Sequence, residues 1–145
     1  MPLYAKFPEN ALGGNAGGDS PIDYLSDTIK CALVTSSYTP NQSTHEWWSD
    51  VSANDVVGTG YTAGGQALAS KTLSASSLVT TLDAADPSWT SSTITARYAV
   101  FYKDTGTGST SPLIAYADFG GNISSTNGTF TVVLNASGLA TITVA

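Results

Sequence analysis

The sequence predicts an all-β fold: a single β-sandwich, jelly-roll or immunoglobulin-like, with an extended N-terminal arm and one or two short helical turns. Two observations support this prediction. Apolar and polar residues alternate with a period of two in several short segments, and Gly, Pro, Asn and Asp separate those segments. The chain of 145 residues has the length of one domain, and we expect an arm over residues 1–19 and a sandwich over residues 20–145.

The expected arm is rich in residues that interrupt regular structure. Pro2, Pro8 and two Gly-Gly pairs lie within residues 1–19, which argues against a regular helix or a central strand there. Four of its side chains are nevertheless large and apolar, so we expect the arm to become ordered by lying on a partner. The candidate partner-binding residues of the arm are Leu3, Tyr4, Phe7 and Leu12.

Strands are predicted wherever the alternation is clear. The clear segments are 28–35, 94–103, 113–117, 129–134 and 140–144, and segments 66–73 and 78–82 are less clear. In the first segment Ile29, Cys31 and Leu33 face one way, and Thr28, Lys30 and Thr35 are among the opposite set.

Turn residues and cap residues set the expected ends of these elements. Gly120-Gly121 closes the segment that begins near residue 113, and the loop 135–138 joins the last two strands as a hairpin. Ser20-Pro21-Ile22-Asp23 has the pattern of a helix start. Segment 44–51 is predicted to form one or two helical turns capped by Thr44.

The charge of the chain excludes several classes of partner. Only 11% of the residues are charged, the formal net charge is −6, and there are five Lys and Arg residues in all. With no basic patch to neutralise phosphates, we expect neither nucleic acid nor a membrane as a partner. The N-terminus lacks the apolar run of a signal peptide, so we expect synthesis in a cytoplasm without signal-peptide secretion.

Residues that could support catalysis are few, and each has a plainer structural interpretation. Cys31 alternates into an apolar face, and His45 is the single histidine. Asp83 and Asp86 precede a proline in a turn-like sequence, although a small hydrolase that uses His45 with either of them is a minor alternative. We therefore predict no enzyme activity, no catalytic residue, no cofactor and no metal site.

Glycine and tryptophan residues gather near the expected loops. Gly58, Gly60, Gly64 and Gly65 accompany no lysine and open no helix, so we expect bends where backbones approach closely, and no phosphate loop. Trp47, Trp48 and Trp89 could stack on a sugar or anchor a protein partner, or they could plug one end of the sandwich. The sequence leaves both roles open for the tryptophans.

Several segments resemble a family of small tailed-bacteriophage proteins. The matching segments are 27–41 (DTIKCALVTSSYTPN), 44–46 (THE), 58–68 (GTGYTAGGQAL), 96–100 (ARYAV), 102–106 (YKDTG), and 111–114 (SPLI) running on to 119–121 (FGG). The resemblance implies a virion component encoded among head and tail genes, with no known activity or cofactor. It brings no functional residues to transfer, and a valine or similar residue is expected where this chain has Cys31.

These observations together lead to an expected function. We expect a capsid decoration, or cement, protein that binds the outer surface of the assembled phage head and stabilises it, with the major capsid protein and sister copies as partners. The expected location is therefore the capsid surface of the virion. Ser and Thr replace charged residues in this chain, and such a surface loses less to desolvation when a partner covers it. The alternative is a receptor- or carbohydrate-binding module on the tail or a fibre.

Overall fold

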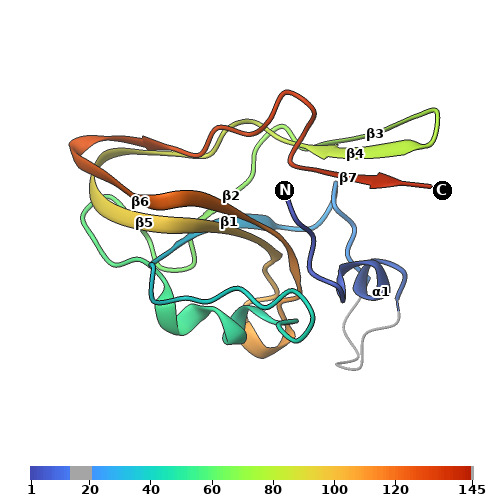
Figure 1. The fold of residues 1–145 in the computed structure, drawn as a ribbon, viewed down its shortest axis with the longest axis horizontal. Helices are drawn as coiled ribbons and strands as arrows, with labels where there is room; N and C mark the ends of the chain where they lie inside the picture. The colour runs from blue at the N-terminus through green and yellow to red at the C-terminus, as the bar shows by residue number, and fades with distance from the viewer. Residues whose placement is uncertain (14–20, 145) are drawn as a thin grey trace.

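The computed structural model describes residues 1–13 and 21–144 and confirms the all-β class, with two antiparallel sheets (Figure 1). The elements are α1 (Phe7–Ala11), β1 (Ile29–Val34), η1 (Trp48–Asp50), η2 (Ser52–Asn54), β2 (Gln66–Ala67), β3 (Thr72–Ser76), β4 (Val79–Asp83), β5 (Ser88–Lys103), η3 (Gly108–Thr110), β6 (Leu113–Thr131) and β7 (Ala140–Thr143). One sheet has the order β2-β1-β5-β6 and the other has the order β3-β4-β7. Four plus three strands is the count of an immunoglobulin constant domain, but the strand order here differs.

The β5–β6 ribbon is much longer than the sequence predicts. β6 continues through Gly120-Gly121 to Thr131, so the expected strand end at these glycines is wrong. Gly120 has a φ of 80°, and the β5–β6 register shifts nearby, between Ala96 and Tyr98. The glycine thus belongs to an irregularity of the kind that bends a strand without ending it. The far end of the ribbon curls over toward the layer of the second sheet (Figure 1).

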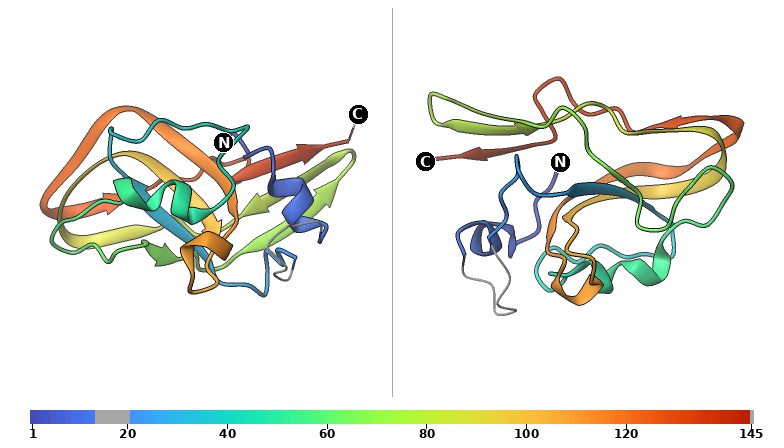
Figure 2. Two further views of the ribbon diagram at one scale, coloured as in Figure 1. Left: turned by 90° about the horizontal axis from the view of Figure 1, so that it is seen from below. Right: turned by 180° about the vertical axis from the view of Figure 1, so that it is seen from behind.

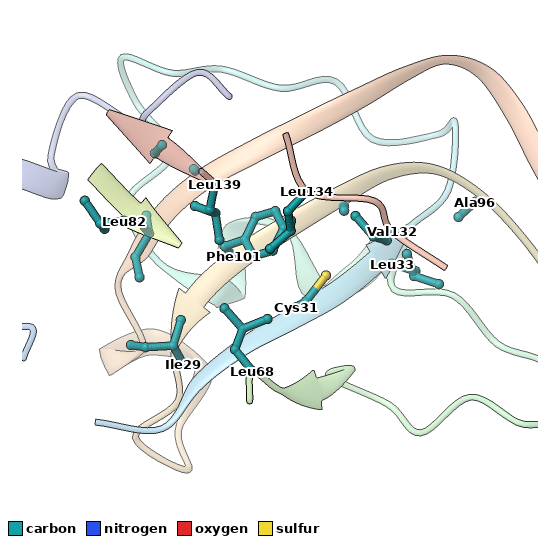
Figure 3. Packing of buried hydrophobic residues seen from close by; sticks show 14 of the residues in the cluster. Ile29, Cys31, Leu33, Leu68, Leu82, Ala96, Phe101, Val132, Leu134 and Leu139 are labelled. Carbon is teal, nitrogen blue, oxygen red and sulfur yellow. The ribbon is translucent and has the colours of Figure 1, made fainter. Parts of the chain in front are cut away.

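The four-stranded sheet is covered on both faces. Between the two sheets lies a core that includes Ile29, Cys31 and Leu33 of β1, as Figure 3 shows. On the opposite face Ala32 and Val34 are also fully buried, in a second cluster with Trp48 of η1. Loops and short helical turns cover this second face. The residues of β1 that face away from Ile29, Cys31 and Leu33 are therefore not all exposed to solvent.

The hairpin expected at the C-terminus is not formed. β6 pairs with β5 while β7 pairs with β4, so the two strands that flank the turn 135–138 belong to different sheets. Between them Val132, Leu134 and Leu139 are buried in the core, where Figure 3 shows them beside Phe101. The predicted strand 129–134 is therefore correct as far as Thr131, and beyond it the alternation reflects burial of a chain that crosses between the sheets.

Both predicted helix starts form turns held by aspartate. The Asp50 carboxylate accepts hydrogen bonds from the backbone N–H groups of Glu46 and Trp47, each at 2.9 Å, so Asp50 and not Thr44 holds the turn before η1. The Asp23 carboxylate accepts from Leu25 and Ser26 N–H, each at 3.1 Å, and no helix follows it. Ser20, the expected cap, lies outside the described residues.

The described part of the expected arm packs on the sandwich and contains a helix. Pro8 lies in the first turn of α1, where its missing N–H costs no intrahelical hydrogen bond, so the expected lack of helix was wrong. Tyr4 N–H donates to the Ile114 carbonyl at 3.0 Å, and Tyr116 N–H donates to the Pro2 carbonyl at 3.1 Å. Residues 1–13 are therefore part of the folded body, and residues 14–19 of the expected arm lie outside the described residues.

Candidate functional site

Three of the four expected contact residues near the N-terminus serve the protein's own packing. Tyr4 is 1% exposed and Phe7 is 4% exposed, and Leu3 is half-buried and bridges to Ala115 of β6. Leu12 differs from them, since 88% of it is exposed. The arm interpretation is thus corrected for all three: Leu3 and Tyr4 lie on β6 of the same chain, and Phe7 packs under its three-stranded sheet.

Two of the three tryptophans fill the interior. Trp48 stacks on Tyr102 of β5, and Trp89 contacts the rings of Tyr61 and Phe130. The structure thus decides the question that the sequence left open for Trp48 and Trp89: both are buried. Trp47 is half-buried, which makes it the most exposed of the three, and its backbone bridges to Pro112.

His45 and the two aspartates of the hydrolase alternative belong to separate hydrogen-bond groups. His45 Nδ1 lies 2.9 Å from the Tyr38 hydroxyl, which in turn lies 2.8 Å from the Tyr4 hydroxyl. Asp86 accepts from Leu134 N–H at 2.8 Å, and Asp83 accepts from the N–H of Ala84 at 2.9 Å. No hydrogen bond within the described ranges joins His45 to either carboxylate, so the structure does not bring the pair together.

The remaining candidates from the sequence are structural. Cys31 is fully buried, and burial raises the pKa of its thiol far above the ordinary value, which keeps it protonated. Gly58, Gly60 and Gly65 lie where an added Cβ would meet backbone atoms of a neighbouring segment, as expected for close approach. Across residues 1–13 and 21–144, no three His, Cys, Asp or Glu side chains gather where they could hold a metal ion.

A polar groove beside η1 combines aromatic and charged groups. Its lining includes Lys30, Trp48, Asp55, Tyr102 and Asp104. Lys30 Nζ lies 2.6 Å from the Asp104 carboxylate, and the Tyr102 hydroxyl donates to the Gly64 carbonyl at 2.8 Å. The polar groups of the groove are thus paired with other groups of the groove, and these hydrogen bonds hold its walls together.

Within that groove Asp55 anchors the loop that carries Gly64. Its carboxylate accepts from the Tyr61 hydroxyl and from Gly64 N–H, both at 2.6 Å. Burial raises the pKa of Asp55, and the hydrogen bonds from Tyr61 and Gly64 oppose that rise without cancelling it. Sequence reasoning missed this residue, because nothing local marks it as the partner of a tyrosine six positions later.

A second, apolar groove lies between the three-stranded sheet and α1, and it is the strongest candidate for binding a protein surface. Its volume is about 380 Å³. Its lining residues are Phe7, Ala11, Ile22, Asp23, Tyr24, Leu73, Thr80, Leu82 and Ile142. The three-stranded sheet extends past the end of the four-stranded sheet with α1 beneath it, as the views in Figures 1 and 2 agree.

The sheet above this groove is amphipathic along its whole length. Leu73, Leu82 and Ala140 lie directly opposite one another across the strands and so share one face. Two residues further on, Ile142 is on that same face, followed by Val144, whose N–H donates to the carbonyl of Leu78 in the β3–β4 turn. The chain buries the Leu82 end, but the exposed fractions are 48% for Leu73, 39% for Ile142, 61% for Leu78 and 62% for Val144.

The two edge strands of the same sheet, β3 and β7, carry no charged residue, and Asp83 ends the central strand β4. Residues 72–82 and 140–144 contain no Asp, Glu, Lys or Arg, although the chain as a whole has a net charge of −6. The apolar residues of this face were visible in the sequence as alternation. Their exposure was not, because it depends on where the four-stranded sheet ends beneath them.

Comparisons with known proteins add no assignment: no family model, no curated protein and no solved structure matches this chain. Among the described residues, no helix is both long enough and apolar enough to cross a membrane.

Proposed function

We propose that this protein is a structural component of a tailed-bacteriophage virion, a capsid decoration protein that binds the outside of the assembled head and stabilises it. The observation that supports the proposal is the overhanging apolar face of the three-stranded sheet with the groove beneath it. The resemblance of the sequence to small phage proteins suggests the kind of partner that this face would contact, a phage capsid. The N-terminal contact residues expected from the sequence are replaced here by Leu73, Leu78, Ile142 and Val144.

The physical basis of the contact is the transfer of this face out of water. Burying apolar surface contributes roughly 25 cal/mol per Å². Neighbouring Ser and Thr hydroxyls lose less on desolvation than charged groups would, so the surroundings of the patch oppose binding only weakly. A protein that binds only the assembled shell stabilises it by its binding free energy, by mass action.

The test compares two aspartate substitutions on heads assembled without the protein. Leu73→Asp places a carboxylate in the proposed contact, and Val57→Asp places one at a loop position that is 95% exposed and far along the chain from the sheet. We expect Leu73→Asp to weaken binding to heads at least tenfold, about 1.4 kcal/mol, and Val57→Asp to bind as wild type. Thermal unfolding of both variants provides the folding control.

The copy number on purified virions tests the location. Several hundred copies on the head support the proposal, and a few copies confined to the tail would overturn it in favour of a tail or fibre module. Equal binding of Leu73→Asp and wild type to heads would remove the sheet face as the contact.

A further inference from the structure

The outer edge of β7 is open and regular. β7 is the last strand of its sheet, and its register with β4 runs without a shift from Ala140 to Thr143. Val144 N–H donates to the Leu78 carbonyl at 2.7 Å, so Val144 directs its backbone groups toward the β4 side. Because this direction alternates along an antiparallel strand, Ile142 also faces β4, and the N–H and C=O groups of Thr141 and Thr143 point away from the sheet.

This edge lacks the features that protect most edge strands. Natural sheets block free edges with charged side chains, proline, bulges or covering segments. β7 has the sequence Ala-Thr-Ile-Thr, with no charge and no proline, and no bulge interrupts its pairing. Thr and Ile are β-branched and favour strand geometry, so the edge is well suited to accept another strand.

We propose that β7 of one copy pairs antiparallel with β7 of a second copy about a two-fold axis at Ile142. Thr141 of one copy then lies opposite Thr143 of the other, and these two residues exchange the backbone hydrogen bonds that point outward in the single chain. Ile142 meets its own counterpart as a non-hydrogen-bonded pair, the closer kind of cross-strand pair. The two three-stranded sheets become one continuous sheet of six strands.

The charge distribution favours a second copy as the occupant. Each copy carries a net charge of −6, so two copies repel unless they meet where carboxylates are absent. Residues 72–82 and 140–144 provide such a place. A two-fold axis also makes the contact self-complementary, because each residue of the edge meets a residue of the same short, neutral strand.

β3, the opposite edge of the sheet, is the less favourable choice. By the same alternation its outward backbone groups belong to Leu73 and Ala75, and a two-fold axis there would pair Ser74 with itself. Ser and Ala form weaker cross-strand contacts than Ile and Thr. The two edges thus make different predictions for the same experiments.

This step rests on the proposed decoration function: if the protein binds phage heads, pairing through β7 would also strengthen that binding. The apolar faces of the two sheets lie on the same side of the joined sheet, so one dimer offers the shell two contacts. Linked contacts bind more tightly than either alone, through effective concentration.

Cysteine cross-linking tests the register. Ile142→Cys places two thiols on the axis at a Cβ separation of about 4.5–5.5 Å, near the range that a disulfide accepts. We expect oxidised Ile142→Cys to run as a covalent dimer on a non-reducing gel. The matched variant Ser74→Cys on β3 should stay monomeric on that gel, and buried Cys31 provides the same background in both.

Proline substitution tests the hydrogen bonds. Thr141→Pro removes an N–H that points outward from the pairing with β4, and Ala75→Pro does the same on β3. By light scattering, wild type and Ala75→Pro should have twice the 14.9 kDa chain mass, and Thr141→Pro should dissociate at least ten times more readily. A monomeric wild type, or dissociation by Ala75→Pro with Thr141→Pro unaffected, would overturn the proposal.

These measurements use purified protein without phage heads. A dimer whose Leu73→Asp variant still binds heads normally would therefore contradict the proposed decoration contact and leave the β7 pairing intact. A monomeric wild type whose binding to heads requires Leu73 would contradict the β7 pairing and leave the proposed decoration contact intact.

Discussion

The indole of Trp48 lies flat on the phenol ring of Tyr102, with ring centroids 4.5 Å apart and ring planes within 5° of parallel. This contact joins η1 to β5 and closes the second core, on the face of the four-stranded sheet that loops cover. The stacking contact makes Trp48 a core residue, while its neighbour Trp47 is only half-buried.

Substitution of the two adjacent tryptophans should therefore have unequal effects on stability. Trp48→Ala removes a buried ring and its stacking partner's contact, and we expect the free energy of unfolding to fall by about 3–5 kcal/mol. Trp47→Ala should cost less than Trp48→Ala, because Trp47 is only partly buried. Urea unfolding followed by fluorescence measures both, and equal losses would contradict the assignment of Trp48 to the core.

The N-terminal segment offers a second matched pair. Phe7→Ala empties a buried position under the three-stranded sheet and should destabilise the fold by about 3–5 kcal/mol. Leu12→Ala, five residues later and 88% exposed, should change stability by no more than about 0.5 kcal/mol. Thermal unfolding of the full chain distinguishes them. If Phe7→Ala proved neutral, the segment would not be part of the folded body.

Asp55→Ala removes the acceptor of two hydrogen bonds and should cost about 1–3 kcal/mol near neutral pH. The pKa of Asp55 is raised on folding, so within the carboxyl range the folded state binds more protons here than the unfolded state does. The stability advantage of wild type over Asp55→Ala should thus decrease as pH rises through that range and then level off. Urea unfolding at a series of pH values tests this, and an advantage that grows with pH would mean that the pKa is lowered instead.

Three glycine-to-alanine variants separate steric overlap from backbone strain. At Gly65, with a φ of 76°, a Cβ would overlap the Cys31 carbonyl group where β2 joins β1, and we expect loss of the native fold. Gly106 has a φ of 86° and open space around it, so Gly106→Ala should cost only about 1–2 kcal/mol of strain. Gly121 has neither feature and should be near neutral by circular dichroism melting. A mild Gly65→Ala would show that β2 does not approach β1 so closely.

Local patterns were sufficient for the fold class and for part of the core. The alternation at Ile29, Cys31 and Leu33 predicted a strand with these residues inside, and they are fully buried. The same kind of pattern was misleading at Val132 and Leu134, which alternate like a strand but cross between sheets as core filling. Alternation reports which side chains avoid water, and it does not report which strand supplies the neighbouring backbone.

The candidate contact residues divide in the same way. Leu3, Tyr4 and Phe7 looked like anchors for a partner because prolines and glycines surround them, yet β6 of the same chain receives Leu3 and Tyr4. Leu73 and Ile142 looked like ordinary strand residues, yet they line an open groove. Each error has one cause: exposure depends on segments far away in sequence.

The sequence by itself determined that this chain forms strands with little charge on their surfaces, because side-chain period and composition are local properties. Only the tertiary structure decided which faces are covered. It folded the N-terminus back onto β6, placed Trp48 and Trp89 inside, and left the three-stranded sheet extending beyond its support with a neutral, apolar face and an open β7 edge. Burial depends on packing between segments that are distant in the sequence. The sequence therefore showed that the chain has little surface charge, and only the tertiary structure showed where the uncharged, exposed surface lies.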